Sequence, residues 1–246
     1  MPIGYEIVDG GQNIPYHLLF YMIVHFGRIP NNTDIIYYFP KGTRFAEKIF
    51  DILPKNWIRH YEKQIGYTYT KDHISVPSWP DYMMPEAYDY MRFVFSHHMS
   101  NQIIARKYIY ISRNRGDTTR QITNEDDVMA VLEIFGFKKI YMEDLTGEEH
   151  ISIFNTADFI ISPHGSALTF TTFCSPTVSI VEILGEPLTK FRHFSHIAWH
   201  FGFDFTRFTD VETKIIDTET NNNNMKVDCK KLYQTLIHHK KFYSSR

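Results

Sequence analysis

Strand-like and helix-like segments alternate without a break from residue 107 to residue 184. Four segments have the apolar, partly β-branched composition of strands: 107–113 (KYIYISR), 138–144 (KKIYMED), 158–163 (DFIISP) and 177–184 (TVSIVEIL). The segments that follow the first three of them, 124–136, 147–157 and 166–174, have helical character. Strands joined through helices pair in parallel, because each connection must cross the sheet. The alternation therefore predicts a Rossmann-like domain over residues 105–215, with helices on both faces.

The amino-terminal part is less regular. Its segments 14–27, 33–40, 44–53, 65–70 and 85–99 suggest helix, strand, helix, strand and helix. Prolines in residues 76–88 interrupt any regular element, so we expect the domain connection along the helix that follows. The chain then divides into domains 1–103 and 104–246, with a ligand in the cleft between them.

Two segments near the carboxyl terminus complete the picture. The asparagine run 221–224 has no periodicity and is interpreted as a solvated linker. Residues 229–239 (CKKLYQTLIHH) predict a final helix.

Composition excludes several classes of protein. The net charge of the 246 residues is −2 with both signs interspersed, so no basic field is present to hold nucleic acid. Two cysteines cannot build a disulfide framework. The apolar run 18–24 is too short for a membrane span, and no secretory signal is seen, so the default expectation is a cytoplasmic protein. Compartment and oligomeric state stay open.

Arginines cluster after the first strand of the regular region. Arg113, Arg115 and Arg120 surround a Gly-Asp turn, and a guanidinium fork donates paired hydrogen bonds to phosphate oxygens. The alternative is a solvated loop with surface arginines. Arg113 favours the binding hypothesis, because carboxyl ends of parallel strands meet at one edge, where open α/β sheets bind ligands.

A Pro-His-Gly-Ser turn follows the strand at 158–163. Gly165 permits close approach of a ligand, Ser166 is expected to cap the next helix, and His164 can donate to a phosphate oxygen. Glu182 ends a further strand at the same edge and can accept from ribose hydroxyls. A structural turn and a salt-bridged carboxylate are the alternatives.

Three histidines share one face of a predicted helix. His193, His196 and His200 stand at offsets of three and seven, which permits zinc binding. The set lacks a carboxylate or cysteine partner and the glutamate of HExxH. GxSxG, P-loop and GxGxxG motifs are absent, which argues against a serine hydrolase, a P-loop NTPase and a dinucleotide oxidoreductase.

With these residues identified, the chain resembles glycosyltransferase family 61, the DUF563 proteins, which include protein O-linked N-acetylglucosaminyltransferases and plant xylosyl- and arabinosyltransferases. The resemblance lies in YISRNRGDTTRQITNEDDV, GEEHISIFNTADFIISPHGSALTFTTF and VEI, which cover about residues 108–183 in the family's order. The segment DGGQNIPYHLLFYMIVHFGRI resembles the family's early helix.

The resemblance implies a GT-B-like fold, two Rossmann-like domains with a cleft, and inverting transfer from a nucleotide-sugar, usually UDP-linked, to a glycan or protein hydroxyl. It implies no cofactor and no essential metal. Arg113 and Arg120 would contact the diphosphate, the turn of His164, Gly165 and Ser166 would hold the phosphates, and Glu182 would lie near the ribose.

The catalytic base is not identified by the resemblance. Many relatives carry an acidic residue one turn after the early-helix histidine, where this chain has Tyr21 after His17. His17, with an unperturbed pKa of about 6.5, and Asp9 are the candidates. A non-catalytic nucleotide-sugar-binding protein and a metal hydrolase using the histidine helix are the rival hypotheses.

Overall fold

The structure, a computed structural model, describes residues 3–6, 35–38, 48–49, 52, 60–61, 85–99, 107–115, 120–186, 188–217 and 222–243. The chain forms two compact units, each described by itself. The first comprises Met1–Ser100 and Leu145–Ser152, and the second comprises Asn101–Asp144 and Ile153–Arg246.

The first unit contains a small parallel sheet in the order β1-β2-β3. Its elements are β1 (Ile3–Glu6), β2 (Ile35–Tyr38), β3 (His60–Tyr61), α3 (Pro85–Val94) and the 3₁₀-helix η2 (Ser96–His98). The strand expected in 33–40 and the helix expected in 85–99 are confirmed, while β1 and β3 were not predicted. The expected elements at 14–27, 44–53 and 65–70 lie wholly or largely outside the described residues.

The second unit is built on a five-stranded parallel sheet in the order β5-β4-β6-β7-β8. Its strands are β4 (Lys107–Ile111), β5 (Lys138–Ile140), β6 (Ala157–Pro163), β7 (Ser179–Ile183) and β8 (Asp204–Phe208). An antiparallel hairpin of β9 (Val211–Asp217) and β10 (Asn222–Val227) follows them. The helices that lie wholly in this unit are α4 (Glu125–Ile134), α6 (His193–Phe201), α7 (Cys229–Ile237) and α8 (Lys240–Tyr243), with 3₁₀-helices η3 (Met142–Asp144), η4 (Ser166–Phe173) and η5 (Leu188–Lys190). Helix α5 (Gly147–Asn155) is shared, since its residues up to Ser152 belong to the first unit and the rest to the second.

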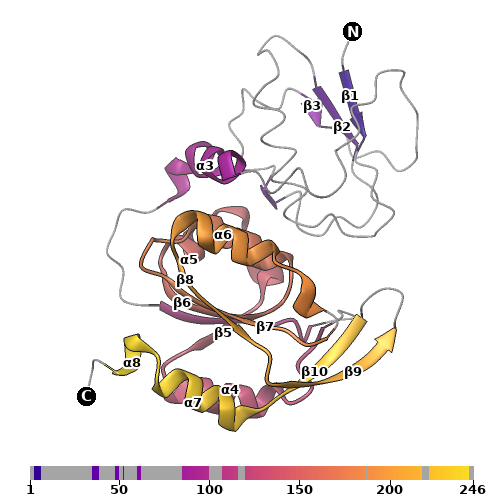
Figure 1. Ribbon diagram of the computed structural model, residues 1–246. Coiled ribbons are helices and arrows are strands. Elements are labelled where there is room, and N and C mark those ends of the chain that lie inside the picture. The colour runs from indigo at the N-terminus through magenta and orange to yellow at the C-terminus, as the bar shows by residue number, and fades with distance from the viewer. Residues whose placement is uncertain are drawn as a thin grey trace. The chain divides into compact units, whose positions relative to one another are not determined.

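Helices cover both faces of this sheet, as the alternation predicted. Figure 1 shows α4 and α7 on one face and α6 on the other. Side chains of a strand alternate between the faces, so Val181 and Ile183 pack in the core beneath α4 and α7, where Leu132 and Leu232 join them. Glu182 lies between Val181 and Ile183 and therefore points to the opposite face.

The structure adds one strand to the sequence analysis, refines one helix and corrects one interpretation. Residues 204–208 form β8, a strand that the sequence analysis did not single out. Residues 166–173 form a 3₁₀-helix, the tighter i→i+3 coil, and not an ordinary α-helix. The asparagine run is not a solvated linker, since residues 222–224 open β10 and Asn223 is buried.

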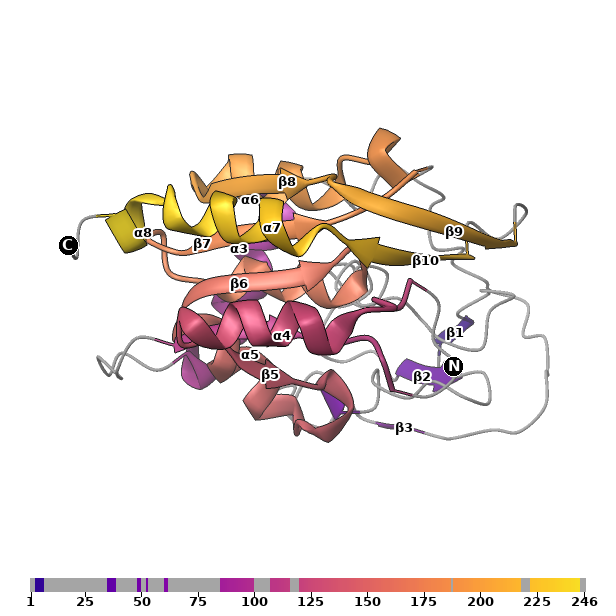
Figure 2. The same cartoon turned by 90° about the horizontal axis from the view of Figure 1, so that it is seen from below.

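Helix α8 lies at the edge of the sheet where the strands begin (Figure 2). Lys241 donates to the carbonyls of Asp158 and Thr177, which stand at the starts of β6 and β7. His239 pairs with Asp204 at the start of β8, with 3.0 Å between Nε2 and Oδ2. The expected carboxyl-terminal helix is confirmed as α7, and α8 continues it over this edge. In the described segments no helix has the length and apolarity that a membrane crossing requires.

Candidate functional site

The site lies at the carboxyl edge of the five-stranded sheet. Counted by their order along the chain, the strands of this sheet lie side by side in the order 2-1-3-4-5. From β4 the chain passes to β5 on one side, and it then returns across the sheet to β6 on the other side of β4. In doubly wound sheets, ligands bind outside the strand ends where this change of direction occurs. Arg113 follows the end of β4 and His164 follows the end of β6, so both flank that point.

Arg113 packs against the backbone of Gly165. A Cβ atom added to Gly165 would overlap the Arg113 guanidinium, which explains the glycine by close approach. Burial and the neighbouring charge of Arg120 lower the pKa of Arg113 to about 9. Arg113 is therefore still charged at neutral pH, but the positive charge is held at a cost that a bound anion would offset.

Arg120 approaches the same turn from its own loop. Its φ of 66° is left-handed, which is uncommon for a residue with a side chain. Its Nη1 donates to the carbonyl oxygen of His164 over 3.2 Å, and burial lowers the pKa of its guanidinium. Two arginines from separate loop positions thus meet at the His164–Gly165 turn.

Arg115, the third arginine of this segment, is placed elsewhere. It is exposed, pairs with Asp144 and lies over the ring of Tyr141, with 3.9 Å from Cζ to the ring centroid. The structure therefore separates the arginines into two at the turn and one at the surface.

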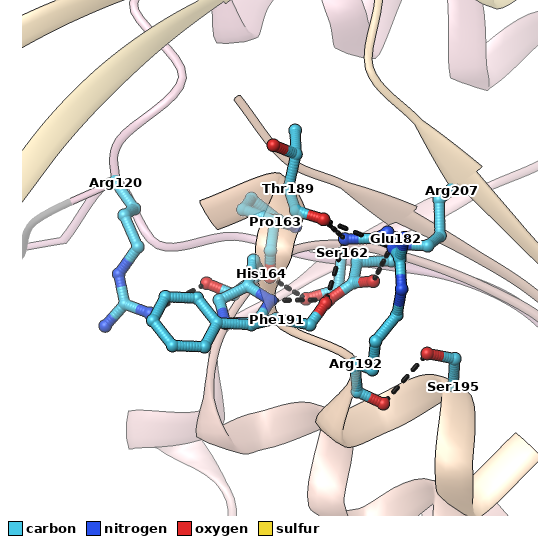
Figure 3. A network of polar contacts seen from close by, with 10 residues as sticks. All are labelled: Arg120, Ser162, Pro163, His164, Glu182, Thr189, Phe191, Arg192, Ser195 and Arg207. Carbon is cyan, nitrogen blue, oxygen red and sulfur yellow. Dashed lines mark hydrogen bonds and ion pairs between the residues drawn. The ribbon is translucent and has the colours of Figure 1, made fainter. Parts of the chain in front are cut away.

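His164 is held by a buried carboxylate (Figure 3). Its Nδ1 lies 2.5 Å from Oε1 of Glu182, and both residues are almost completely buried. Because the carboxylate accepts, Nδ1 carries the proton and Nε2 becomes the atom available for a ligand. This is how carboxylates orient histidines in many active sites.

Arg207 balances the charge of that carboxylate, with 3.4 Å between its Nε and Oε2 of Glu182. Its Nη2 also donates to the carbonyls of Thr189 and Phe191, at 2.9 Å each. Sequence analysis missed Arg207. The signal was an arginine between Thr206 and Phe208 in an aromatic strand, on the face opposite the buried Phe208.

The start of η4 differs from the expectation for Ser166. Gly165 is the residue that precedes the first turn, and no side chain caps it. The backbone turn is instead closed by Leu168 N–H donating to the Gly165 carbonyl over 2.9 Å, while the His164 N–H donates to Ile183 over 2.8 Å. Ser166 directly follows the His164–Gly165 turn and is partly exposed, but it does not cap the 3₁₀-helix.

The three histidines of α6 do not form a metal centre in this structure. His193 stacks on Phe191, with ring centroids 5.3 Å apart, and His200 packs edge-on against Phe201. Within the ranges that the structure describes, no group of three His, Cys, Asp or Glu side chains is arranged to hold a metal ion. His17 and Asp9, the candidates for the catalytic base, lie outside the described residues.

The arrangement is suited to an anionic group. Two partly buried guanidiniums and an oriented imidazole converge on one glycine turn. The guanidiniums donate hydrogen bonds, and the imidazole donates from Nε2 as well when both of its ring nitrogens are protonated.

A comparison with curated proteins finds no match to the chain. Residues 20–181, more than half of the sequence, match the family model described as Glycosyltransferase 61. The matched region includes Arg113, Arg120 and the His164–Gly165 turn. Membership implies glycosyl transfer, with a nucleotide-sugar donor and an acceptor as substrates. The chain belongs to glycosyltransferase family 61.

Proposed function

We propose that this protein is an inverting glycosyltransferase that moves a sugar from a UDP-sugar to a hydroxyl of a glycan or a protein. In this proposal the fold is GT-B-like, with two Rossmann-like domains. Residues 104–246 bind the donor and residues 1–103 bind the acceptor. No metal ion or cofactor takes part.

The observation that carries the proposal is the pair of arginines at the His164–Gly165 turn. Burial and, after it, the charge of Arg120 lower the pKa of Arg113, so the two neighbouring cations are held together at a cost in free energy. A diphosphate carries the opposite charge and accepts the paired hydrogen bonds that guanidiniums donate. Arginines would thus provide the positive charge that a divalent cation provides in other transferases.

His164 would complete the phosphate site. With Nδ1–H directed to Glu182, Nε2 is the ring nitrogen left for the phosphate, and it donates to a phosphate oxygen when the imidazole carries a proton on both nitrogens. Each such oriented donor commonly stabilises a developing negative charge by about 3 to 4 kcal/mol. The ribose contact of Glu182 stays a prediction of the family resemblance, since the contacts of its carboxylate described above are to His164 and Arg207.

The chemical step is a displacement at the anomeric carbon. The acceptor hydroxyl oxygen forms the new bond while the bond to the diphosphate oxygen breaks. Its proton passes to a base, for which His17 is the first candidate and Asp9 the second. The departing diphosphate takes the bonding electron pair, and Arg113 and Arg120 stabilise its charge.

Binding of UDP tests the donor site. We expect UDP to raise the melting temperature without added metal, because a ligand that binds only the folded protein stabilises it. EDTA should leave this shift unchanged. Arg113→Ala and Arg120→Ala should each weaken UDP binding by about 1.5 to 3 kcal/mol, the range for hydrogen bonds to charged groups.

Arg115→Ala is the matched control. It removes a guanidinium from the same segment, but one that faces Asp144 and Tyr141. UDP affinity equal to wild type in Arg113→Ala and Arg120→Ala would contradict the phosphate assignment. A shift that disappears in EDTA would contradict metal-free binding. UDP binding without transfer across a broad panel of donors and acceptors would favour a non-catalytic binding protein.

A further inference from the structure

The asparagines that open β10 lie in a place where strand propensity does not explain them. Asparagine is depleted in strands, yet Asn223 and Asn224 pair with β9 in the antiparallel hairpin. Asn223 is 2% exposed and Asn224 is partly buried. Figure 2 shows the hairpin beyond the end of the sheet opposite to α8, the end at which the strands finish. Side-chain contacts must therefore account for these residues.

Asn224 binds the loop that carries Arg120. Its Oδ1 accepts from the backbone N–H of Gln121, the residue after Arg120, over 3.0 Å. The backbone continues the contact, since the N–H of Met225 donates to the Gln121 carbonyl and the N–H of Thr123 donates to the Met225 carbonyl, both over 2.8 Å. β10 thus holds residues 121–123 alongside itself, directly after the left-handed residue.

Asn223 fixes the same strand to a second loop. Its Nδ2 donates to the carbonyl of Glu186 over 2.9 Å. Glu186 lies in the connection after β7, between Ile183, which accepts from the His164 N–H, and Thr189, which accepts from Arg207. The strand that holds the Arg120 loop is therefore also bound to the connection after β7, whose first part accepts from the His164 backbone.

From these contacts we infer that Asn224 is a positioning residue for Arg120 in donor binding, an inference that rests on the proposed function. A non-glycine residue with φ of 66° costs free energy, and a long side chain loses conformational freedom when it is fixed. The bond from Gln121 N–H to Asn224 helps to offset both costs before a donor arrives. Arg120 is then already directed to the His164 carbonyl, so less ordering remains for binding to drive.

A double-mutant cycle tests the link. Asn224→Ala should weaken UDP binding, measured by calorimetry, by about 3- to 10-fold, the equivalent of one hydrogen bond. In an Arg120→Ala background the same change should have no further effect, because Asn224 acts only through Arg120. Lys226→Ala is the matched control, since Lys226 is an exposed residue of the same strand, and it should bind UDP like wild type.

A second measurement works without any ligand. The order parameter of the Arg120 Nε–H vector, measured by NMR relaxation, should fall in Asn224→Ala and stay unchanged in Lys226→Ala. Additive effects in the cycle, or an unchanged order parameter in Asn224→Ala, would overturn the inference. Failure of the wild type to bind UDP would refute the proposed function instead, and the order parameter would still decide whether Asn224 positions Arg120.

Discussion

Substituting Gly165 by alanine should damage donor binding without damaging the fold. The φ of Gly165 is 174°, an extended conformation that any residue adopts, so alanine adds no backbone strain. The added Cβ would overlap Nη1 of Arg113 and lie 3.1 Å from its Cζ. The guanidinium would have to move by roughly 1 Å to restore an ordinary van der Waals separation.

The size of the effect follows from that displacement. A hydrogen bond stretched by about 1 Å from its usual 2.9 Å lies outside the bonding range. Loss of one bond to a charged group costs about 1.5 to 3 kcal/mol, so the UDP dissociation constant should rise about 10- to 150-fold. Stability should change little, because alanine in place of glycine also lowers the entropy of the unfolded chain by about 0.4 to 1 kcal/mol.

Gly202→Ala provides the opposite pattern. Gly202 has φ of 70° and ends α6, and nothing lies within 4 Å of an added Cβ. Alanine there should lower the free energy of unfolding by about 1 to 2 kcal/mol through left-handed strain while UDP affinity is unchanged. Calorimetry with UDP and urea unfolding of both variants give the two readouts.

The reasoning would be refuted by wild-type UDP affinity in Gly165→Ala. It would also be refuted if Gly165→Ala weakened binding equally in an Arg113→Ala background, because the structure assigns the whole effect to displacement of Arg113.

Three further predictions follow from the site and the amino edge of the sheet. His17→Ala should abolish sugar transfer and leave UDP affinity within about threefold of wild type, roughly 0.7 kcal/mol. If transfer is retained, His17 is not the catalytic base and Asp9 becomes the candidate. Arg207→Met should lower the free energy of unfolding at pH 7 by about 3 to 5 kcal/mol, because Glu182 would stay buried without its cation. The double variant with Glu182→Met should recover part of this loss. If it recovers none, the ion pair between Arg207 and Glu182 is not the source of the loss. Burial raises the pKa of Asp204, but hydrogen bonds from Lys240 and Ser179 outweigh it, so the pKa is lowered. The stabilisation is therefore present at neutral pH and is lost as pH falls through the lowered pKa. The difference of about 1 kcal/mol in unfolding free energy between wild type and Asp204→Asn should vanish in strongly acidic solution, as urea unfolding at several pH values would show.

The regular part of the second unit was predictable because its signals are local. The apolar runs of β4, β6 and β7 predict strands, and the helical spacing of apolar residues in α4 predicts a helix. Parallel pairing of β4 and β6 then brings Arg113 and His164 to one edge of the sheet. β8 was not predicted because its sequence DFTRF mixes aromatic and polar residues without a regular alternation and lacks an apolar run.

The contacts within the site were not predictable from local sequence. Glu182 meets Arg207 only through the register that pairs them across β7 and β8, and register depends on the whole sheet. The asparagine run has the composition of a loop, and it becomes part of a strand through pairing with β9 and through side-chain contacts to Gln121 and Glu186. Ser166 has a typical capping residue type, but the turn is closed by backbone groups.

The position of α8 has a practical consequence for measuring these affinities. Lys241 binds this helix to the starts of β6 and β7, so α8 lies at the end of the sheet opposite to the one at which the strands finish. Immobilisation on a sensor surface through the carboxyl terminus would therefore leave the edge of this sheet at which we propose that the diphosphate binds directed into the flowing solution. An amine-coupled surface, which attaches lysines at random, would present a mixture of orientations, so the two surfaces should differ in the fraction of protein that binds UDP.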